Sequence, residues 1–519
     1  MRHLVSKVVV VTALILFAMM MGFFIAVFGL SGWFIPAVPL VLMFGVALWM
    51  APDIDPHFDK AIKRGYFIFI AIFLIWPGYL AFNVPGLPWV SFARLAMFAL
   101  MVIFFMQLAM SRRFRNEIHE TFASNIWMTR FFLGWIAITV LMSAAAGFSN
   151  ADRDVNMQIM WHLPMIMTAW IMRADKNPQR FFYLMIAYIL VTAGVTIPEY
   201  IQGMPIWSPY IPHWLLAEES FTGFLLDGGR RFDIYRVRSI YLVPLAYAEF
   251  IGMSVPFILL GIMHAKSFWR LALAFALFLL LFTAAWLTQA RTALIVFVAT
   301  IPAFILLWAV RRYRLRRTEQ DIISTAVLWA YPACAMALAL AVTAVPRIRV
   351  RVFGGTGTQN SDDARAAQWD MAIAQILQNP LGYGSGSLQE RVPYTNRAGD
   401  FTVDAYPINL LIEHGVIGFI LFAGFFLIAL YTGARSYILA KDEDELVAGA
   451  AALSILSFLV SRTILSMEAG IPLAFVMAGL ILAIHWRQQK RMQAEAPRPA
   501  SAALSRRYEA RGIPVGAKA

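Results

Sequence analysis

The amino-acid sequence predicts an all-α polytopic membrane protein, and three observations lead to this fold class. Of the 519 residues, 60% are hydrophobic and only 14% are charged, whereas soluble domains are about half apolar and a quarter charged. The chain contains many separate apolar runs of about 20 residues, the length that a helix needs to cross a hydrocarbon layer. These runs lack the short alternating pattern of β-barrel strands, so helices are expected.

We expect fourteen membrane spans joined by polar connections. The first follows Arg2, His3 and Lys7 and begins like a signal peptide, but no clear small-residue cleavage site follows, so we interpret it as a retained span. The expected spans are 8–28, 33–50, 66–84, 92–111, 126–148, 157–172, 181–201, 240–263, 270–289, 291–310, 322–345, 406–433, 446–463 and 467–486.

Basic residues divide the connections into two classes. One class carries clusters such as Arg112 to Arg115 and Arg311 to Arg317, and the positive-inside rule places these connections and both termini in the cytoplasm. All eight lysines fall on that side: Lys7, Lys60, Lys63, Lys176, Lys266, Lys441, Lys490 and Lys518. The opposite side carries only arginines: Arg94, Arg153, Arg230, Arg231, Arg236, Arg238, Arg291, Arg347, Arg349, Arg351, Arg365, Arg391, Arg397 and Arg462.

The arginine-only side favours an external site for a phosphate-bearing substrate. A guanidinium binds phosphate through two parallel hydrogen bonds, whereas a lysine ammonium acts as a point charge suited to a lipid surface. The alternative is that few external positions tolerate lysine. Because the net charge of +13 is distributed by membrane side, it does not indicate nucleic-acid binding.

Two long external loops divide the chain, and their length marks them as functional or disordered. Loop A contains aromatic residues throughout, including Trp207, Tyr210 and Trp214, and is expected to lie against the membrane interface. The resulting organisation is N-terminal spans 1–201, loop A 202–239, central spans 240–345, loop B 346–405, C-terminal spans 406–486 and a basic, disordered tail 487–519.

Loop B contains an amphipathic helical pattern in DARAAQWDMAIAQILQ. Its apolar face is expected to combine Ala366, Trp369, Ile373 and Ile376/Leu377, with Asp362 or Asp363 as the cap. The following Gly382-x-Gly384-x-Gly386 comes after a helix, not a strand, which disfavours a nucleotide site. A turn that lets the backbone approach a ligand or a helix is the better interpretation.

No metal or redox site is predicted. The single cysteine, Cys334, allows no disulfide framework within the chain, and the eight histidines lack ligand spacing. His162 is interpreted as a packed, satisfied residue, and a structural role is also preferred for His414. We expect no cofactor.

Charged residues within or at the ends of spans are more informative, because they tend to face a cavity or one another. Each has two interpretations, a contact with substrate or an ion pair that locks helices together. Arg291 is the best candidate for a substrate contact, and Glu249 is the best candidate for a structural role. The set is Arg130, Glu199, Glu249, Arg291, Arg462 and Glu468.

Three segments make the chain resemble the O-antigen ligase and polymerase superfamily of bacterial envelope enzymes. The first is Arg236-Val-Arg238 before Pro244, and the second is Gln289-Ala-Arg291-Thr292 at the start of a span. The third, the most specific, runs from Arg365-x3-Trp369 through NPLGYGSG to LIEHGVIG, ending at Gly418. The resemblance covers roughly residues 190–430 and implies a GT-C-like membrane enzyme.

The chain departs from the ligases of this superfamily at one position. Those enzymes place His-Asn eleven residues before the first glycine of the Gly-x-x-Gly pair, where this chain has Asp404 and Ala405. An aspartate there is similar to the exopolysaccharide repeat-unit polymerases. The resemblance therefore implies that polyprenyl-diphosphate-linked oligosaccharide repeat units are joined on the periplasmic face of a bacterial inner membrane.

The expected chemistry assigns roles to seven residues. Fixed guanidiniums stabilise the diphosphate leaving group, and a carboxylate accepts the proton of the attacking sugar hydroxyl. Asp404, Arg291 and Arg365 are the catalytic candidates, with Arg238, Arg236, Arg351 and Arg462 as diphosphate-binding candidates. A helix N-cap is the alternative role for Asp404, because Pro407 in the next turn is typical of a helix start.

The partners implied are lipid-linked oligosaccharides, membrane lipids, and flippase and chain-length regulator proteins, without nucleic acid. Two other functions stay open. A ligase would transfer finished glycan to an acceptor such as lipid A. A transporter would use helices broken near mid-membrane, for which Pro164, Pro244, Pro256 and Pro302 are candidates.

Overall fold

The computed structural model describes residues 57–82, 90–147, 150–215, 230–231, 234–316, 321–344, 359–395 and 401–495. It confirms an all-α polytopic membrane protein. Within these residues nine helices are long and apolar enough to cross a membrane. They are α4 (Phe92–Met110), α6 (Ile126–Ala145), α9 (Asn177–Gln202), α11 (Pro244–Met263), α12 (Phe268–Leu287), α13 (Arg291–Leu315), α19 (Gly415–Ile438), α20 (Glu443–Arg462) and α21 (Ile471–Glu495).

The expected spans 8–28 and 33–50 lie outside the described residues. The remaining elements connect or flank the spans. They are α3 (Asp59–Ile75), β1 (Ala81–Phe82), β2 (Val90–Ser91), α5 (Arg112–Ala123), α7 (Ala151–Met157), the π-helix η2 (Gln158–His162), α8 (Leu163–Ile171), the 3₁₀ turns η3 (Ser208–Tyr210) and η4 (His213–Leu215), β3 (Arg230–Arg231), β4 (Ile234–Tyr235), α14 (Ile322–Ala344), α16 (Gln359–Gln378), α17 (Leu388–Arg391) and α18 (Tyr406–Glu413). The strands form two antiparallel pairs, β1–β2 and β3–β4.

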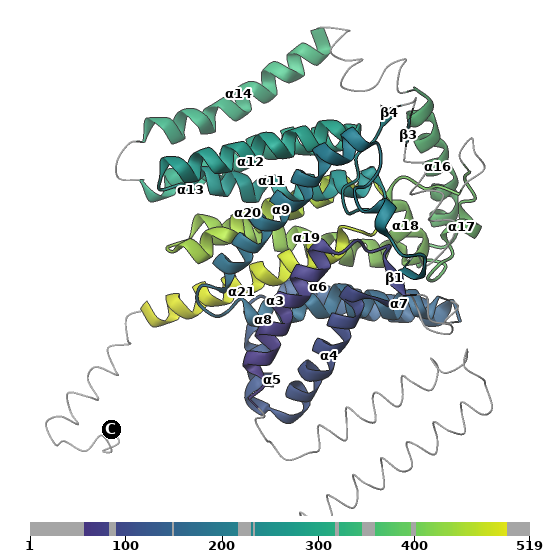
Figure 1. Cartoon of the computed structure of the whole chain (residues 1–519), viewed down its shortest axis with the longest axis horizontal. Coiled ribbons are helices and arrows are strands. Elements are labelled where there is room, and N and C mark those ends of the chain that lie inside the picture. Colours follow the sequence, from purple (N-terminus) through teal and green to yellow (C-terminus); the bar gives the residue numbers. More distant parts are fainter. Residues whose placement is uncertain are drawn as a thin grey trace, which may run out of the picture.

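The bundle has two chemically different ends. β3, β4, α7 and α16 to α18 gather at one end, which we call the loop end, and α21 runs to the opposite, tail end (Figure 1). Helix α3 begins at the tail end, because Asp59 in its first turn pairs with Arg113 of α5 at 2.7 Å. All described lysines lie at helix termini or connections of the tail end, beside arginines such as Arg113 and Arg487, so lysine is confined to one end of the described bundle.

Three helices form the centre of the bundle. In α20 and α21, 83% of the residues in the apolar 18-residue stretch that could cross the membrane are buried, and in α11 78% are buried, compared with 22% in α12. Small residues allow this close packing, as in most helix contacts within membranes. A Cβ atom on Gly479 of α21 would collide with the Met165 carbonyl of α8. The peripheral helices keep apolar faces for lipid.

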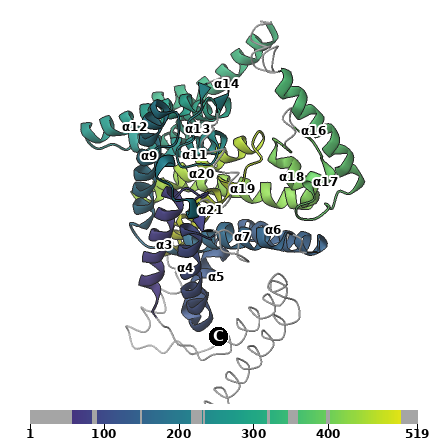
Figure 2. The same cartoon turned by 45° about the vertical axis from the view of Figure 1, so that its right-hand side comes forward.

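Loop B is an ordered unit with a small core of its own. Helices α16, α17 and α18 enclose buried Ala372, Leu388, Val392, Val403, Ala405, Ile408 and Ile412, against which Trp369, Ile376 and Tyr383 pack. Figure 2 shows α16 on the outer flank, with α17 and α18 between it and the bundle. The described part of this loop is therefore structured.

The expected continuous span 406–433 is wrong, because it divides at His414 into α18 and α19. Gly415 adopts a φ of +68°, which is left-handed backbone that glycine tolerates best. The turn after α16 packs directly against this break: Tyr383 and Gly384 donate N–H bonds to the carbonyls of Ile412 and Glu413, at 2.9 and 3.1 Å. The glycine turn does bring backbone against a helix junction, as the sequence indicates.

The face of α16 also differs from expectation. Gln368 and Ala372 are buried and Trp369 is half-buried, whereas Ala366, Ile373 and Leu377 are exposed. The helix begins at Gln359, so Asp362 and Asp363 lie inside it and are not its cap. The apolar residues of α16 lie on more than one face of the helix. Which face is buried depends on the surface against which the helix packs.

The expected span 157–172 begins with one turn of π-helix that buries His162. The Trp135 indole N–H donates to His162 Nε2 at 3.1 Å, and His162 Nδ1 lies 2.6 Å from Gln158 Oε1. Because an indole only donates, His162 is neutral with its proton on Nδ1. The interpretation of His162 as a packed, satisfied residue is confirmed.

The C-terminal boundary needs correction as well. Helix α21 continues to Glu495, so the first residues of the expected disordered tail are helical. Arg487 and Arg491 in this segment pair with carboxylates of α20, which explains why the helix extends past its apolar part.

Candidate functional site

The turn that carries Arg236 and Arg238 runs beside the start of α13. Val237 donates its N–H to the Leu287 carbonyl at 3.1 Å, and Arg236 Nε donates to the Thr288 carbonyl at 3.1 Å. Thr288 lies three residues before Arg291. The structure therefore brings the first two sequence motifs of the site together.

A buried carboxylate holds this turn in place. Glu199, in the last turn of α9, is fully buried. Its Oε1 accepts the Arg238 N–H at 3.0 Å and the Tyr235 hydroxyl at 2.8 Å, and its Oε2 accepts the Ser239 N–H at 2.8 Å. Ser239 has a φ of +51°, an uncommon conformation for a non-glycine residue. Glu199 thus compensates for a strained turn.

The three arginines of this region differ in access. Arg238 is fully buried, close enough to Glu199 for electrostatic attraction, and donates through Nη1 to the Leu242 carbonyl at 3.3 Å. Arg236 is partly exposed, and Arg291 is exposed in the first turn of α13. Within the described residues Arg291 has no ion-pair partner. Arg291 can therefore meet a ligand directly, whereas Arg238 supports the turn.

The third motif forms a second group on loop B. Gln368 of α16 accepts the Asp404 N–H at 3.0 Å and donates to the Thr402 carbonyl at 3.4 Å. Arg365 lies three residues before Gln368, on the same face of α16, and is partly buried. Packing of α16 on the segment before α18 thus brings Arg365 and Asp404 to one region.

Asp404 is not the helix cap. The N-cap residue of α18 is Ala405, without a side-chain hydrogen bond, while Pro407 does occupy the first turn. The Asp404 carboxylate is partly exposed, and its Oδ1 lies 3.5 Å from the Thr402 hydroxyl. A carboxylate that is accessible and does not cap its helix can accept a proton from a ligand.

Arg462 has the helix-locking role. It is 3% exposed and donates through Nε to Glu249 Oε1 at 2.9 Å; a second nitrogen also contacts Glu249, and a third contacts the Met467 carbonyl. This buried pair fixes the turn between α20 and α21. Arg462 is therefore not accessible for the predicted contact with a diphosphate. Arg351 lies outside the described residues.

A further charged cluster was missed by sequence reasoning. Arg153 of α7 contacts Glu413 at 3.2 Å and Glu468 at 2.8 Å. Burial would lower the pKa of the Arg153 guanidinium, but these two carboxylates raise it overall. The sequence does predict that Arg153 and Glu468 are charges on the external side. Nothing in it indicates that two residues so far apart form an ion pair.

The cluster joins loop B to the membrane helices. Ser385 donates its hydroxyl to Asp154 at 2.7 Å and its N–H to the Met142 carbonyl at 3.2 Å. Beside them, His414 is buried against the Trp135 ring at 5.1 Å between centroids, and neither ring nitrogen has a hydrogen-bond partner among the described residues, so its structural role stays a prediction. Loop B is thereby anchored on α6 and α7 as well as on α19.

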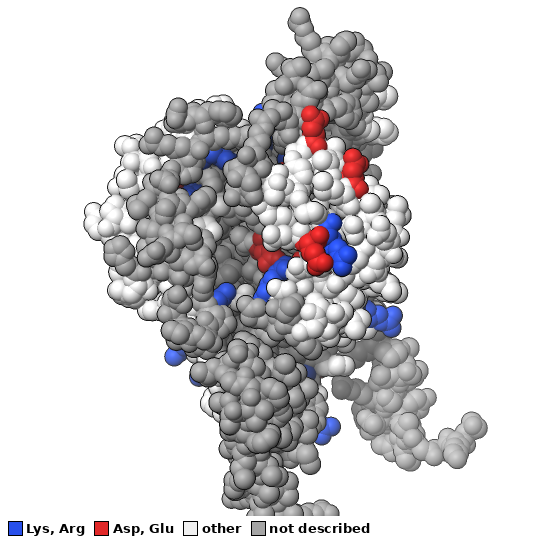
Figure 3. All heavy atoms as spheres, turned by 90° about the vertical axis from the view of Figure 1, so that its right-hand side faces the viewer, with Lys and Arg blue, Asp and Glu red and all other residues white. Residues whose placement is uncertain are grey.

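A cavity of about 650 Å³ opens in the same half of the molecule. It lies between α3, α4, α9, α11 and the α20–α21 turn, with a largely apolar lining that includes Trp161, Tyr188 and Phe250. Arg94, Asn156 and Glu468 supply polar groups. Seen end-on, the loop end presents charged side chains of both signs near its middle (Figure 3).

Comparison with known proteins identifies one segment. Residues 275–423 match the family model described as O-antigen ligase. The matched segment runs from α12 into α19 and includes Arg291, Arg365 and Asp404, whereas Arg236, Arg238 and Arg462 lie outside it. A search of curated proteins finds no match.

Proposed function

We propose that this chain, which belongs to the O-antigen ligase/polymerase superfamily, joins polyprenyl-diphosphate-linked oligosaccharide repeat units into an exopolysaccharide or O-antigen-like chain. The family supports a glycosyltransferase-like role in polysaccharide assembly on lipid-linked oligosaccharides. The observation that carries the finer proposal is Asp404. It stands at the place of the expected ligase histidine, is partly exposed, and does not cap α18.

The proposed step is a displacement at the anomeric carbon of the donor sugar. The hydroxyl oxygen of the acceptor sugar forms the new glycosidic bond, and the bond between that carbon and the lipid diphosphate breaks. The hydroxyl proton passes to the Asp404 carboxylate as general base. The leaving lipid diphosphate keeps the electron pair, and its charge is stabilised by guanidiniums.

The arginines divide into contact and support roles in this proposal. Within the matched segment, Arg291 is exposed and Arg365 is partly exposed. Arg236 is also partly exposed, and its hydrogen bond to the Thr288 carbonyl holds it near Arg291. These three are proposed to hold the diphosphate. Arg238 supports the turn through Glu199, so we give it no direct contact with the ligand.

We place the loop end on the periplasmic face of a bacterial inner membrane, with both termini cytoplasmic. The segregation of lysine to the tail end supports this orientation, since basic connections favour the cytoplasm. A flippase that delivers the lipid-linked units and a regulator of chain length remain proposed partners.

The test is the size of the glycan made by a deletion strain complemented with Asp404→Asn, Arg291→Ala or Arg365→Ala. Arg130→Ala is the matched control, because Arg130 is an exposed arginine over the Trp127 ring, away from the site. We expect single repeat units on lipid in the three site variants and full polymer in the control, at equal protein levels measured by immunoblot.

Two other results would change the assignment. The description of the matched family favours a ligase as the second candidate; a ligase predicts polymer of normal length that is no longer attached to its acceptor. Lipid-linked units trapped on the cytoplasmic face would instead indicate transport and contradict the proposal.

A further inference from the structure

The outer face of α16 changes character along its length. The exposed residues from position 363 to 370, which we call the acidic half, include Asp363 and Asp370. The exposed residues of the rest of the helix, which we call the apolar half, are Met371, Ile373, Ala374, Leu377 and the terminal Gln378. Leu377 is 78% exposed and Leu381, just after the helix, is 60% exposed. Large apolar side chains with such exposure at neighbouring positions usually mark a surface that something apolar covers.

The position of this apolar half indicates that lipid covers it. The Val416 N–H donates to the Pro380 carbonyl at 2.9 Å, which ties the end of α16 to the first turn of the membrane span α19. That turn exposes Val416, Ile417 and Ile420. The apolar half of α16 and Leu381 are therefore continuous with the lipid-facing side of α19.

The direction of the helix agrees with this position. α16 lies crosswise to α12 and α13 (Figure 1), and a helix that binds in the plane of a membrane interface has one apolar face along the surface. Loop A shows a second interfacial signature at the same end, since Tyr210 and Trp214 are exposed aromatic residues. Tyrosine and tryptophan collect at the boundary between lipid and water.

We propose that the apolar half of α16, with Leu381, inserts into the lipid headgroup–acyl boundary at the loop end and anchors loop B there. The acidic half stays in water. The opposite face of the same helix carries Arg365 and Gln368, and Gln368 binds the segment that contains Asp404. Insertion therefore sets the height of Arg365 and Asp404 relative to the lipid surface, where a lipid-linked diphosphate lies.

The test uses spin labels on the full chain, reconstituted in vesicles of phosphatidylethanolamine and phosphatidylglycerol. Cys334 is the single cysteine and is exposed, so Cys334→Ser provides the background. Labels are placed by Leu377→Cys and Leu381→Cys, by Asp370→Cys on the acidic half, and by Ile420→Cys in α19 as a reference within the membrane. Collision rates are measured with oxygen, which partitions into lipid, and with a neutral nickel chelate, which stays in water.

We expect oxygen collisions to exceed nickel collisions at Leu377, Leu381 and Ile420, and the reverse at Asp370. A second variant, Leu377→Asp combined with the label at Leu381, is expected to shift the Leu381 label toward nickel. More nickel than oxygen at both Leu377 and Leu381 in the parent background would overturn the proposal, because that face would lie in water. Protection from both reagents would also overturn it, because another protein surface would cover the helix.

Discussion

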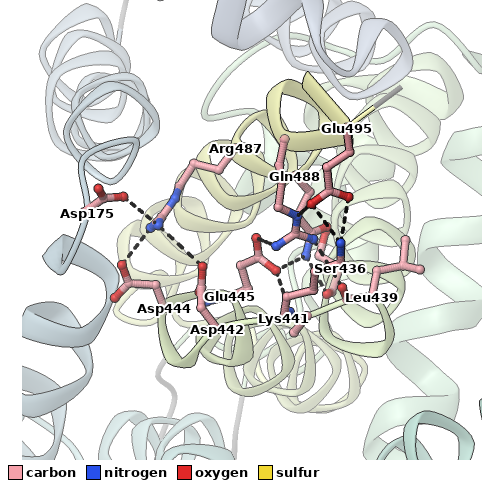
Figure 4. A network of polar contacts seen from close by, with 12 residues as sticks. Asp175, Ser436, Leu439, Lys441, Asp442, Asp444, Glu445, Arg487, Gln488 and Glu495 are labelled. Carbon is pink, nitrogen blue, oxygen red and sulfur yellow. Dashed lines mark hydrogen bonds and ion pairs between the residues drawn. The ribbon is translucent and has the colours of Figure 1, made fainter. Parts of the chain in front are cut away.

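The two ends of the bundle both carry many charges, but they use them differently. At the tail end, Arg487 lies among Asp175, Asp442 and Asp444, and Lys441 pairs with Glu495 (Figure 4). These pairs join α20, α21 and the start of α9, with Arg487 and Asp444 largely buried and Asp175, Lys441 and Glu495 exposed. At the loop end, Glu199, Glu249 and Glu413 are at most 1% exposed, and each receives donors from a distant segment.

The difference teaches which charges hold the fold and which are available for chemistry. A buried carboxylate must be matched by donors, so Glu199, Glu249 and Glu413 hold turns and helix ends in fixed positions. The exposed or partly exposed Arg291, Arg365 and Asp404 stand on those supported segments. At the tail end the charges contribute to anchoring and orientation, and none is needed for the proposed reaction.

The largest expected effect is at the buried pair of the loop end. Arg462→Met leaves Glu249 buried without its ion-pair partner, which costs about 3–5 kcal/mol. We expect a lower unfolding temperature in detergent and loss of monodisperse protein on size-exclusion chromatography. The double variant Glu249→Leu with Arg462→Met should recover much of the stability, because both charges are then removed. An Arg462→Met protein as stable as the parent would contradict the buried pair.

A second, smaller effect is expected at Glu199. Glu199→Gln keeps the shape but replaces one acceptor oxygen by a donor, so at least one of the three bonds to the turn is lost, at about 1.5–3 kcal/mol for a bond to a charged group. Polymer length should fall further than stability, because the turn also positions Arg236. The measurement is glycan size beside thermal unfolding, with Thr283→Ala on α12 as an exposed control. If both the glycan size and the unfolding temperature of the variant equal those of the parent, Glu199 does not hold the turn in place.

At the tail end, Asp444 gives an intermediate prediction. Its two oxygens accept the backbone N–H groups of Lys176 and Gln179, at 2.7 and 3.3 Å, and so cap α9 from another helix. Asp444→Asn keeps one acceptor but weakens the contact with Arg487, and a loss of about 1–2 kcal/mol is expected. Polymer length should stay normal at matched protein levels. A shortened polymer would show that the two ends are coupled.

The smallest effect is expected for Lys441→Ala. Both members of its pair with Glu495 are more than half exposed, and exposed pairs contribute about 0–1 kcal/mol because water and salt screen them. Thermal unfolding should differ little from the parent, and less still at high salt. A loss as large as that at Asp444 would mean that this end is more buried than its exposure indicates.

Much of the fold was accessible from sequence because apolar length and basic connections act locally. The apolar runs predicted the described spans to within a few residues at α4 and α13, and the confinement of lysine to one side predicted which helix ends lie together. The break at His414 was not accessible: the run from Tyr406 to Tyr431 is apolar except for Asn409, Glu413 and His414, and only docking of the Gly382 turn reveals the division. The buried face of α16 was missed for the same reason.

The candidate site shows the same division. Arg291, Arg365 and Asp404 could be selected from residue type and spacing, and each lies at the loop end. The partners of their supports could not be predicted, because Glu199 binds a turn at the end of loop A, and Arg153 meets a residue of α18 that lies 260 positions further along the chain. The sequence also predicted diphosphate contacts for Arg238 and Arg462, although burial gives them supporting roles.

The sequence by itself determined that this protein lies in a membrane, the order of most described helices, and the confinement of lysine to one end. Each of these follows from hydropathy and charge along short stretches. The tertiary structure alone decided which arginines remain accessible, where α18 ends, and which face of α16 points outward. Those outcomes depend on which distant surfaces meet, because a buried charge or a backbone turn is stable only where its partner supplies the missing hydrogen bonds.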